Sequence, residues 1–189
     1  MMYSASDLRK GLKIELDGEP YIVTDFEFCK PGKGQALYRC KLKNMISGTT
    51  LDKTFRSVDK VGKPDLEERD MIFSYVDMDR YVFLDAETYA PVHVPKDVLG
   101  EQVNFLVEDT ECPVLFYEDK PIEVTLPTFI EMAIVKTDPG VRGDTATNVT
   151  KPATVENGYE VQVPIFLNEG DVIRIDTRTG EYIERVSKA

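Results

Sequence analysis

The segment with the clearest chemical character is the short stretch Lys30-Pro31-Gly32-Lys33-Gly34-Gln35-Ala36. Proline fixes its own φ, and glycine accepts positive φ values, so the two glycines permit a tight turn on either side of Lys33. The GxxxxGK[ST] spacing of a nucleotide-binding phosphate loop is absent. The pattern predicts a hairpin loop that carries one long cationic side chain, that of Lys33, at its apex.

The strand expected after this loop, residues 36–42, has a strong charge pattern. Alternation places Arg39, Lys41 and Lys43 on one face and the apolar residues on the other. A row of cations with this spacing suits a phosphate backbone. The alternative is an ordinary hairpin with a solvated basic face, and residue composition alone favours that alternative.

Two later segments have the residues of turns. The stretch 138–145 is rich in Gly, Pro and Asp, contains Gly143, Asp144 and Thr145, and as bare sequence is a connecting loop. The stretch from Lys151-Pro152-Ala153 through Gly158 to Pro164 and Gly170 reads as a turn followed by an edge-like strand, interrupted by a proline that lacks the amide donor of a central strand.

The sequence contains no recognisable catalytic constellation. His93, the single histidine, lies between two valines with no partner nearby in sequence, so we expect a structural role. No nucleophile elbow, HExxH motif or dinucleotide fingerprint occurs. The three cysteines are far apart and form no CxxC pair, which predicts neither a disulfide framework nor a metal site. We therefore expect a protein that is not an enzyme and needs no metal or dissociable cofactor.

Strand signals dominate the rest of the chain. Asp17-Gly18 separates two runs of strand-forming residues and predicts a tight hairpin turn. Further strands are expected at residues 72–75, 81–84, 103–107, 114–117, 122–126, 129–135, 159–165, 172–175 and 182–186. Only residues 95–100 suggest a short helix. Many short strands separated by Gly, Pro and Asp turns indicate an all-β protein built of barrels or sandwiches.

Charge divides the chain into unequal parts. Residues 1–63 carry a net charge of +4, residues 64–126 carry −12, and residues 127–189 carry −3. Breaks at Gly62-Lys63-Pro64 and at Pro127 predict three modules, residues 1–63, 64–127 and 128–189. A basic first module favours a polyanionic partner. The sequence has no apolar run long enough for a membrane helix, and we expect a cytoplasmic protein.

Taken together, these motifs resemble those of bacterial elongation factor P along essentially the whole chain. The matching stretches, in order, are 11–14, 16–21, 30–36, 53–55, 87–89, 137–140, 143–145, 151–154 and 176–182. Some positions differ from those usual in the family: Val58-Asp59 replaces a Gly-Glu-like pair, and Leu37 stands where phenylalanine is frequent. Neither difference touches the loop around Lys33.

The resemblance implies a KOW-type, Src-homology-three-like barrel followed by two OB-folds, arranged in an L that is similar to a tRNA in outline. It also implies a monomer that binds both ribosomal subunits beside the peptidyl-tRNA and promotes peptide-bond formation at consecutive prolines. In that view Lys33 and its neighbours Lys30, Pro31, Gly32, Gly34 and Gln35 face the acceptor end of the peptidyl-tRNA. Gly143, Asp144 and Thr145 approach the small subunit and the exit-site mRNA codon.

The resemblance further implies that a modifying enzyme extends Lys33 with a lysyl-type group, although other lysine extensions occur in the family. The residues by themselves leave two other classes of protein as alternatives. A generic RNA-binding barrel protein would explain the basic first module but would show no effect on stalled synthesis. A small-molecule enzyme would need a polar pocket, of which the sequence gives no sign.

Overall fold

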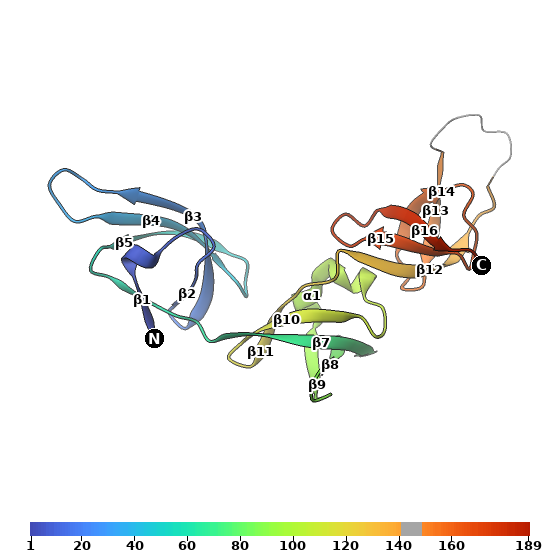
Figure 1. Cartoon of the computed structure of the whole chain (residues 1–189), viewed down its shortest axis with the longest axis horizontal. Helices are drawn as coiled ribbons and strands as arrows, with labels where there is room; N and C mark the ends of the chain where they lie inside the picture. Colours follow the sequence, from blue (N-terminus) through green and yellow to red (C-terminus); the bar gives the residue numbers. More distant parts are fainter. Residues whose placement is uncertain (141–148) are drawn as a thin grey trace. The chain divides into compact units, whose positions relative to one another are not determined.

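The computed structural model of this chain describes residues 1–140 and 149–189. Strands dominate these residues and form three sheets (Figure 1). The expectation of an all-β protein is confirmed. The first sheet contains β1 (Met2–Ser4), β2 (Lys13–Leu16), β3 (Glu19–Cys29), β4 (Leu37–Asn44), β5 (Thr50–Arg56) and β6 (Lys60–Gly62). Its strand order is β1-β6-β2-β3-β4-β5, and a single 3-10 turn, η1 (Ala5–Asp7), follows β1.

The turn at Asp17-Gly18 forms as the sequence predicts. Leu16 pairs with Glu19, so the loop between β2 and β3 has two residues, and both have positive φ, 51° at Asp17 and 76° at Gly18. This geometry matches the right-handed twist of the flanking strands. Alternate residues of β2, β3 and β4 then point into one apolar core, which includes Ile14, Val23 and Leu42.

The second sheet has the strand order β11-β10-β7-β8-β9. Its strands are β7 (Leu66–Asp77), β8 (Arg80–Asp85), β9 (Pro91–Pro95), β10 (Glu111–Tyr117) and β11 (Lys120–Val124). The predicted short helix is present as α1 (Lys96–Leu99), and it continues into the 3-10 helix η2 (Gly100–Phe105).

The predicted strand over residues 103–107 is wrong. Most of it belongs to η2, and Phe105 and Leu106 are buried. The amide of Gln102 donates to the Val124 carbonyl at 3.0 Å, which ties the helical turn to the end of β11. These tertiary contacts outweigh the strand preference of the short apolar run Val103–Val107, which pattern alone cannot distinguish from a buried helix.

The third sheet has the strand order β14-β13-β12-β15-β16. Its strands are β12 (Phe129–Thr137), β13 (Thr150–Val155), β14 (Glu160–Pro164), β15 (Val172–Asp176) and β16 (Tyr182–Ser187). The turn expected in the stretch that begins at Lys151 comes later: residues 151–153 lie in β13, which pairs with strands on both sides, and the chain turns at residues 156–158. Lys151, Ala153 and Val155 alternate inward, and this burial outweighs the turn signal of Pro152. Pro164 does lie on an edge strand, as expected.

By packing, the described residues fall into two compact units. One contains residues 1–67 with 115–122, and the other contains residues 68–114 with 123–189. The division into modules at residues 63 and 127 stays a prediction. Within the described ranges, no helix is long and apolar enough to cross a membrane.

Candidate functional site

The loop that carries Lys33 joins the two longest strands of the first sheet. β3 pairs with β4 from Tyr21–Asn44 to Cys29–Leu37, with a register shift between Val23 and Asp25. The two strands run together toward the loop, and β5 accompanies β4 as far as Leu37, so only residues 30–36 project beyond the paired strands (Figure 1). The long antiparallel ladder thus holds residues 30–36 away from the core of the first unit.

The loop itself is open to solvent. Residues 30–35 are all exposed, and the chain bends at residues 32–34. Among the described residues, none forms a hydrogen bond or an ion pair with the Lys33 side chain. The prediction that Lys33 lies exposed at the tip agrees with this geometry, while its functional role stays a prediction.

The two glycines are not equivalent, contrary to the symmetric turn that the sequence suggests. Gly34 has φ = +151°, which side chains rarely adopt, whereas Gly32 has no positive φ. A Cβ atom would meet nothing within 4 Å at either position. The backbone conformation at position 34 therefore requires a glycine, whereas the backbone conformation at position 32 does not.

An aromatic cluster supports the hairpin just below the loop. The rings of Phe28 and Tyr38 lie 5.2 Å apart between centroids, and those of Phe26 and Tyr38 lie 6.1 Å apart. Phe28 is 52% exposed, so the cluster stands partly in solvent. Ring pairs at such distances stabilise cross-strand contacts by about 0.5–1.5 kcal/mol. The alternation of Phe26 and Phe28 on β3 was the sequence signal for this cluster, which the motif analysis missed.

The basic face of β4 is present, but acidic residues share it. Arg39, Lys41 and Lys43 are exposed, as the alternation predicts. Lys41 lies between Asp25 on β3 and Asp52 on β5. Arg39 lies beside Glu27, while Lys43 has Ile22 and Thr50 as neighbours. Three cations thus share this part of the sheet with three carboxylates, which lowers the positive potential expected from β4 alone.

The second predicted site, Gly143, Asp144 and Thr145, lies outside the described residues. The residues on either side of it are firmly held. Lys151 is 8% exposed, and its amine donates to the Asp138 carbonyl at 2.5 Å. The Thr137 hydroxyl donates to the Pro152 carbonyl at 3.0 Å. A buried lysine amine needs such an acceptor, so these bonds fix where β12 ends and β13 begins.

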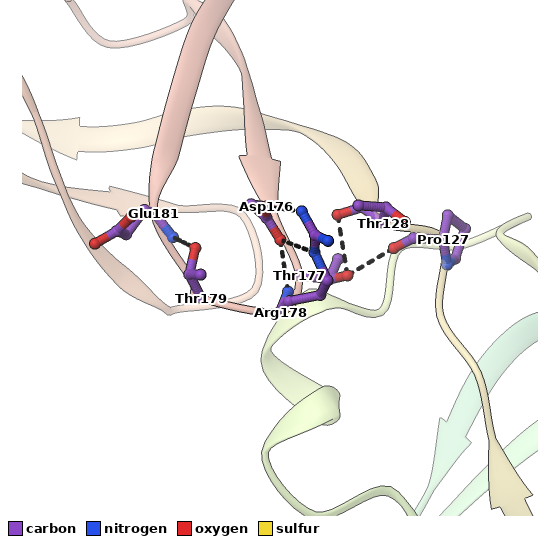
Figure 2. A network of polar contacts seen from close by, with 7 residues as sticks. All are labelled: Pro127, Thr128, Asp176, Thr177, Arg178, Thr179 and Glu181. Atoms are coloured by element: carbon purple, nitrogen blue, oxygen red, sulfur yellow. Dashed lines mark hydrogen bonds and ion pairs between the residues drawn. The ribbon is translucent and has the colours of Figure 1, made fainter.

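The motif at residues 176–182 forms a tightly bonded turn between β15 and β16 (Figure 2). The guanidinium of Arg178 donates through Nε and Nη2 to the carboxylate of Asp176, at 3.1 and 2.8 Å. These bonds hold the pKa of the Asp176 carboxyl below its usual value. The Thr177 hydroxyl donates to the carbonyls of Pro127 and Thr128 at 2.6 and 3.1 Å.

Gly180 closes the same turn. It has φ = +75°, and its carbonyl accepts from the Tyr159 hydroxyl at 3.1 Å. A Cβ atom at this position would lie 2.4 Å from the Tyr159 oxygen. The Tyr159 ring packs edge-on against Phe105, 5.0 Å away between centroids. The motif is thus explained by packing within the second unit.

In the described part of the chain, the histidine and the cysteines do not form a reactive site. His93 is exposed on β9. Burial raises the pKa of the Cys40 thiol, and it raises the pKa of the Cys112 thiol to about 11, so neither forms a thiolate readily. In residues 1–140 and 149–189, no three His, Cys, Asp or Glu side chains gather as metal ligands.

Comparison with known families accounts for nearly the whole chain. Residues 4–61 match the model described as the elongation factor P (EF-P) KOW-like domain, residues 66–124 the elongation factor P OB domain, and residues 130–185 the elongation factor P C-terminal domain. The chain belongs to the elongation factor P family. This is a family of translation elongation factors, so the expectation that the protein is not an enzyme is confirmed.

Full-length relatives support the assignment. Elongation factor P of Desulfosudis oleivorans is 54% identical over 187 residues, which cover 99% of this chain and 100% of the relative. Elongation factor P of Syntrophus aciditrophicus is 52% identical over 98% of this chain and 99% of its own length. Family membership places the chain in the translation machinery, with the ribosome as its partner.

A solved structure shares the fold of about two thirds of this chain at much lower identity. Eukaryotic translation initiation factor 5A from Methanococcus jannaschii aligns with a TM-score of 0.59 and 20% identity, over 67% of this chain and 92% of that structure. At such identity the likeness establishes the architecture alone. Together with the KOW-like and OB family matches, it identifies the small β-modules that the sequence predicted.

Proposed function

We propose that this factor binds the ribosome beside the peptidyl-tRNA and promotes peptide-bond formation at consecutive prolines. The observation that carries the proposal is the exposed tip of the β3–β4 hairpin, where Lys33 has no described partner within the chain. A side chain held out on a long ladder, without a catalytic constellation around it, suits contact with another molecule. The residues of its loop, Lys30 to Gln35, would face the acceptor end of the peptidyl-tRNA.

The physical action that we propose is positioning. Prolyl substrates react slowly, and a factor that holds the tRNA acceptor end in a reactive geometry lowers the entropic part of the barrier. A lysine ammonium offers three donors and a positive charge to phosphate and sugar oxygens. Because these interactions do not break or form covalent bonds, this role requires no nucleophile, general base or metal in the factor.

We also propose that an enzyme extends Lys33 by a lysyl-type group. The exposed side chain between two glycines is accessible to a modifying enzyme, and a Cβ atom built on either glycine meets nothing within 4 Å. A longer amine reaches further toward the tRNA and adds donors. In the same scheme, the loop with Gly143, Asp144 and Thr145 would approach the small subunit and the exit-site codon. The firm base of that loop at Asp138 and Lys151 is consistent with such a role.

The test replaces Lys33 by Ala and by Arg and measures synthesis of a reporter with consecutive prolines. Both variants should fold normally, because changes at exposed loop positions usually alter stability by less than about 0.5 kcal/mol. Lys33→Ala loses the charge, and Lys33→Arg keeps the charge but cannot take the extension, so both should fail to restore synthesis. Intact-mass measurement of protein from the native host should show added mass on the peptide with Lys33.

Lys120→Ala supplies the matched control, since Lys120 is an exposed lysine on β11, outside the loop that carries Lys33. It should retain most of the activity. If both Lys33 variants restore synthesis like the wild type, and the native peptide carries no added mass, Lys33 is an ordinary turn residue. If the wild type binds ribosomes but never relieves stalling, the protein acts only as an RNA-binding module.

A further inference from the structure

A second basic surface lies in the first unit, and it includes residues 11–13 of the first matching stretch, to which the sequence alone assigned no role. It is an open groove of about 410 Å³. Its lining residues are Tyr3, Arg9, Lys10, Gly11, Leu12, Lys13, Lys63, Pro64 and Leu66. Four of these are cations and none is acidic, although Asp65 lies between two lining residues in the chain. We call this surface the N-terminal groove.

Two short segments, far apart in sequence, build the N-terminal groove. The turn after η1 is closed by the Leu12 amide, which donates to the Arg9 carbonyl at 3.1 Å, and Gly11 has φ = +91°. On the other side, Met2 of β1 pairs with Gly62 of β6, and the Lys63 amide donates to the Met1 carbonyl at 3.2 Å. Backbone hydrogen bonds therefore fix the positions from which the side chains of Arg9, Lys10 and Lys63 project.

The cations of the N-terminal groove lack acidic partners. In the part of the chain that the structure describes, no carboxylate forms an ion pair with Arg9, Lys10, Lys13 or Lys63. This differs from the basic face of β4, where Asp25, Glu27 and Asp52 lie across from the cations. Unpaired cations around one concavity create a positive potential that attracts anions.

The floor of the N-terminal groove is apolar. Pro64 is buried, and Leu12, Leu66 and the ring of Tyr3 are half-buried. A cationic rim over an apolar and aromatic floor matches a nucleic-acid strand, whose phosphates meet the rim while a ribose or base lies on the floor. An acidic peptide would use the rim but would leave the ring of Tyr3 without a stacking partner.

We infer that the N-terminal groove is a binding site for an RNA backbone and that it contributes more to ribosome binding than the basic face of β4. The inference rests on the proposed ribosomal role and adds a contact surface, separate from the Lys33 loop. RNA is the occupant that charge complementarity favours, because the site offers four cations and no carboxylate.

The test compares two triple variants with the same change in net charge. One is Arg9→Gln, Lys10→Gln and Lys63→Gln in the N-terminal groove; the matched control is Arg39→Gln, Lys41→Gln and Lys43→Gln on β4. Affinity for 70S ribosomes with a tRNA in the peptidyl site is measured over a range of salt concentrations. Each lost phosphate contact should lower the slope of log affinity against log salt by about 0.7–0.9.

We expect the groove variant to lose about two units of that slope and at least about tenfold in affinity at moderate salt, with a clearly smaller loss for the β4 variant. Equal losses in the two variants, or an unchanged slope for the groove variant, would overturn the inference. Thermal unfolding of both variants checks the fold, and all six replaced side chains are exposed.

A second measurement identifies the occupant and does not depend on those variants. A photoreactive p-benzoylphenylalanine at position 3 of the otherwise wild-type chain should crosslink to ribosomal RNA or tRNA. A crosslink only to a ribosomal protein would assign the groove to a protein partner and refute the RNA site. Both measurements report binding, so they remain readable even if the factor fails to relieve stalling and the proposed function falls.

Discussion

Replacement of Gly34 by alanine tests the structure of the loop around Lys33 most directly. The residue has φ = +151°, and no atom lies within 4 Å of the Cβ that alanine would add. The cost is therefore conformational, with no steric clash. Backbone held in such a region by a residue other than glycine costs on the order of 1–3 kcal/mol.

Gly32→Ala is the matched control, because Gly32 lies two residues away with no positive φ and equal free space. Its expected effect has the opposite sign: a compatible Gly→Ala change stabilises by about 0.4–1 kcal/mol, through the lower entropy of the unfolded chain. The two variants should thus differ by about 1.5–4 kcal/mol if the loop keeps its conformation. If the loop relaxes, the stability difference shrinks, but the tip that carries Lys33 must then move.

The assay is urea unfolding followed by tyrosine fluorescence, which is usable because the chain has nine tyrosines and no tryptophan. Synthesis of the reporter with consecutive prolines is measured in parallel. Gly34→Ala should lose stability, activity or both, and Gly32→Ala should lose neither. If the two alanine variants are equally stable and equally active, the positive φ of Gly34 does not shape the loop.

Two further predictions concern residues away from the Lys33 loop. Gly180→Ala should destabilise the second unit by about 2–4 kcal/mol, because it combines left-handed backbone strain with loss of the Tyr159 hydrogen bond and of the Tyr159 ring contact. The control Gly158→Ala has φ = +81° and free space around the added Cβ, so it should cost only the backbone strain. Equal losses of stability for the two variants in urea unfolding would contradict this. Burial, and then the bond to Glu15, raise the pKa of the Tyr117 hydroxyl from 10.0 to about 12, so the folded state holds this proton more tightly than the unfolded state. Stability of the first unit should therefore fall as the pH rises from about 10 to about 12. Tyr117→Phe should remove this part of the pH dependence, and a variant that keeps the full slope would refute the assignment.

Family membership explains why the motif stretches occur together, but local contacts explain several of them more fully. The turn at residues 176–182 is accounted for by Asp176, Arg178 and Gly180, all of which bond or pack inside the second unit. The loop around Lys33 differs, since its apex bonds to no described residue. A chain segment that is both specific in sequence and free of internal partners is the stronger candidate for contact with another molecule.

The sequence by itself determined the features that depend on neighbouring residues. Period-two alternation placed Arg39, Lys41 and Lys43 outward, Asp17-Gly18 set a two-residue turn, and Pro31 with its glycines set an exposed loop around Lys33. These features follow from backbone sterics and from the two-residue repeat of a strand, which act within a few residues.

Only the tertiary structure decided the features that join distant residues. It placed Asp25 and Asp52 beside Lys41, and it brought Lys63 next to Arg9 and Lys10 through the pairing of β1 with β6. It also made residues 103–105 helical and gave positive φ to Gly34 but not to Gly32. Strand pairing and burial set these outcomes, and both depend on groups that lie tens of residues away along the chain, which a local pattern does not contain.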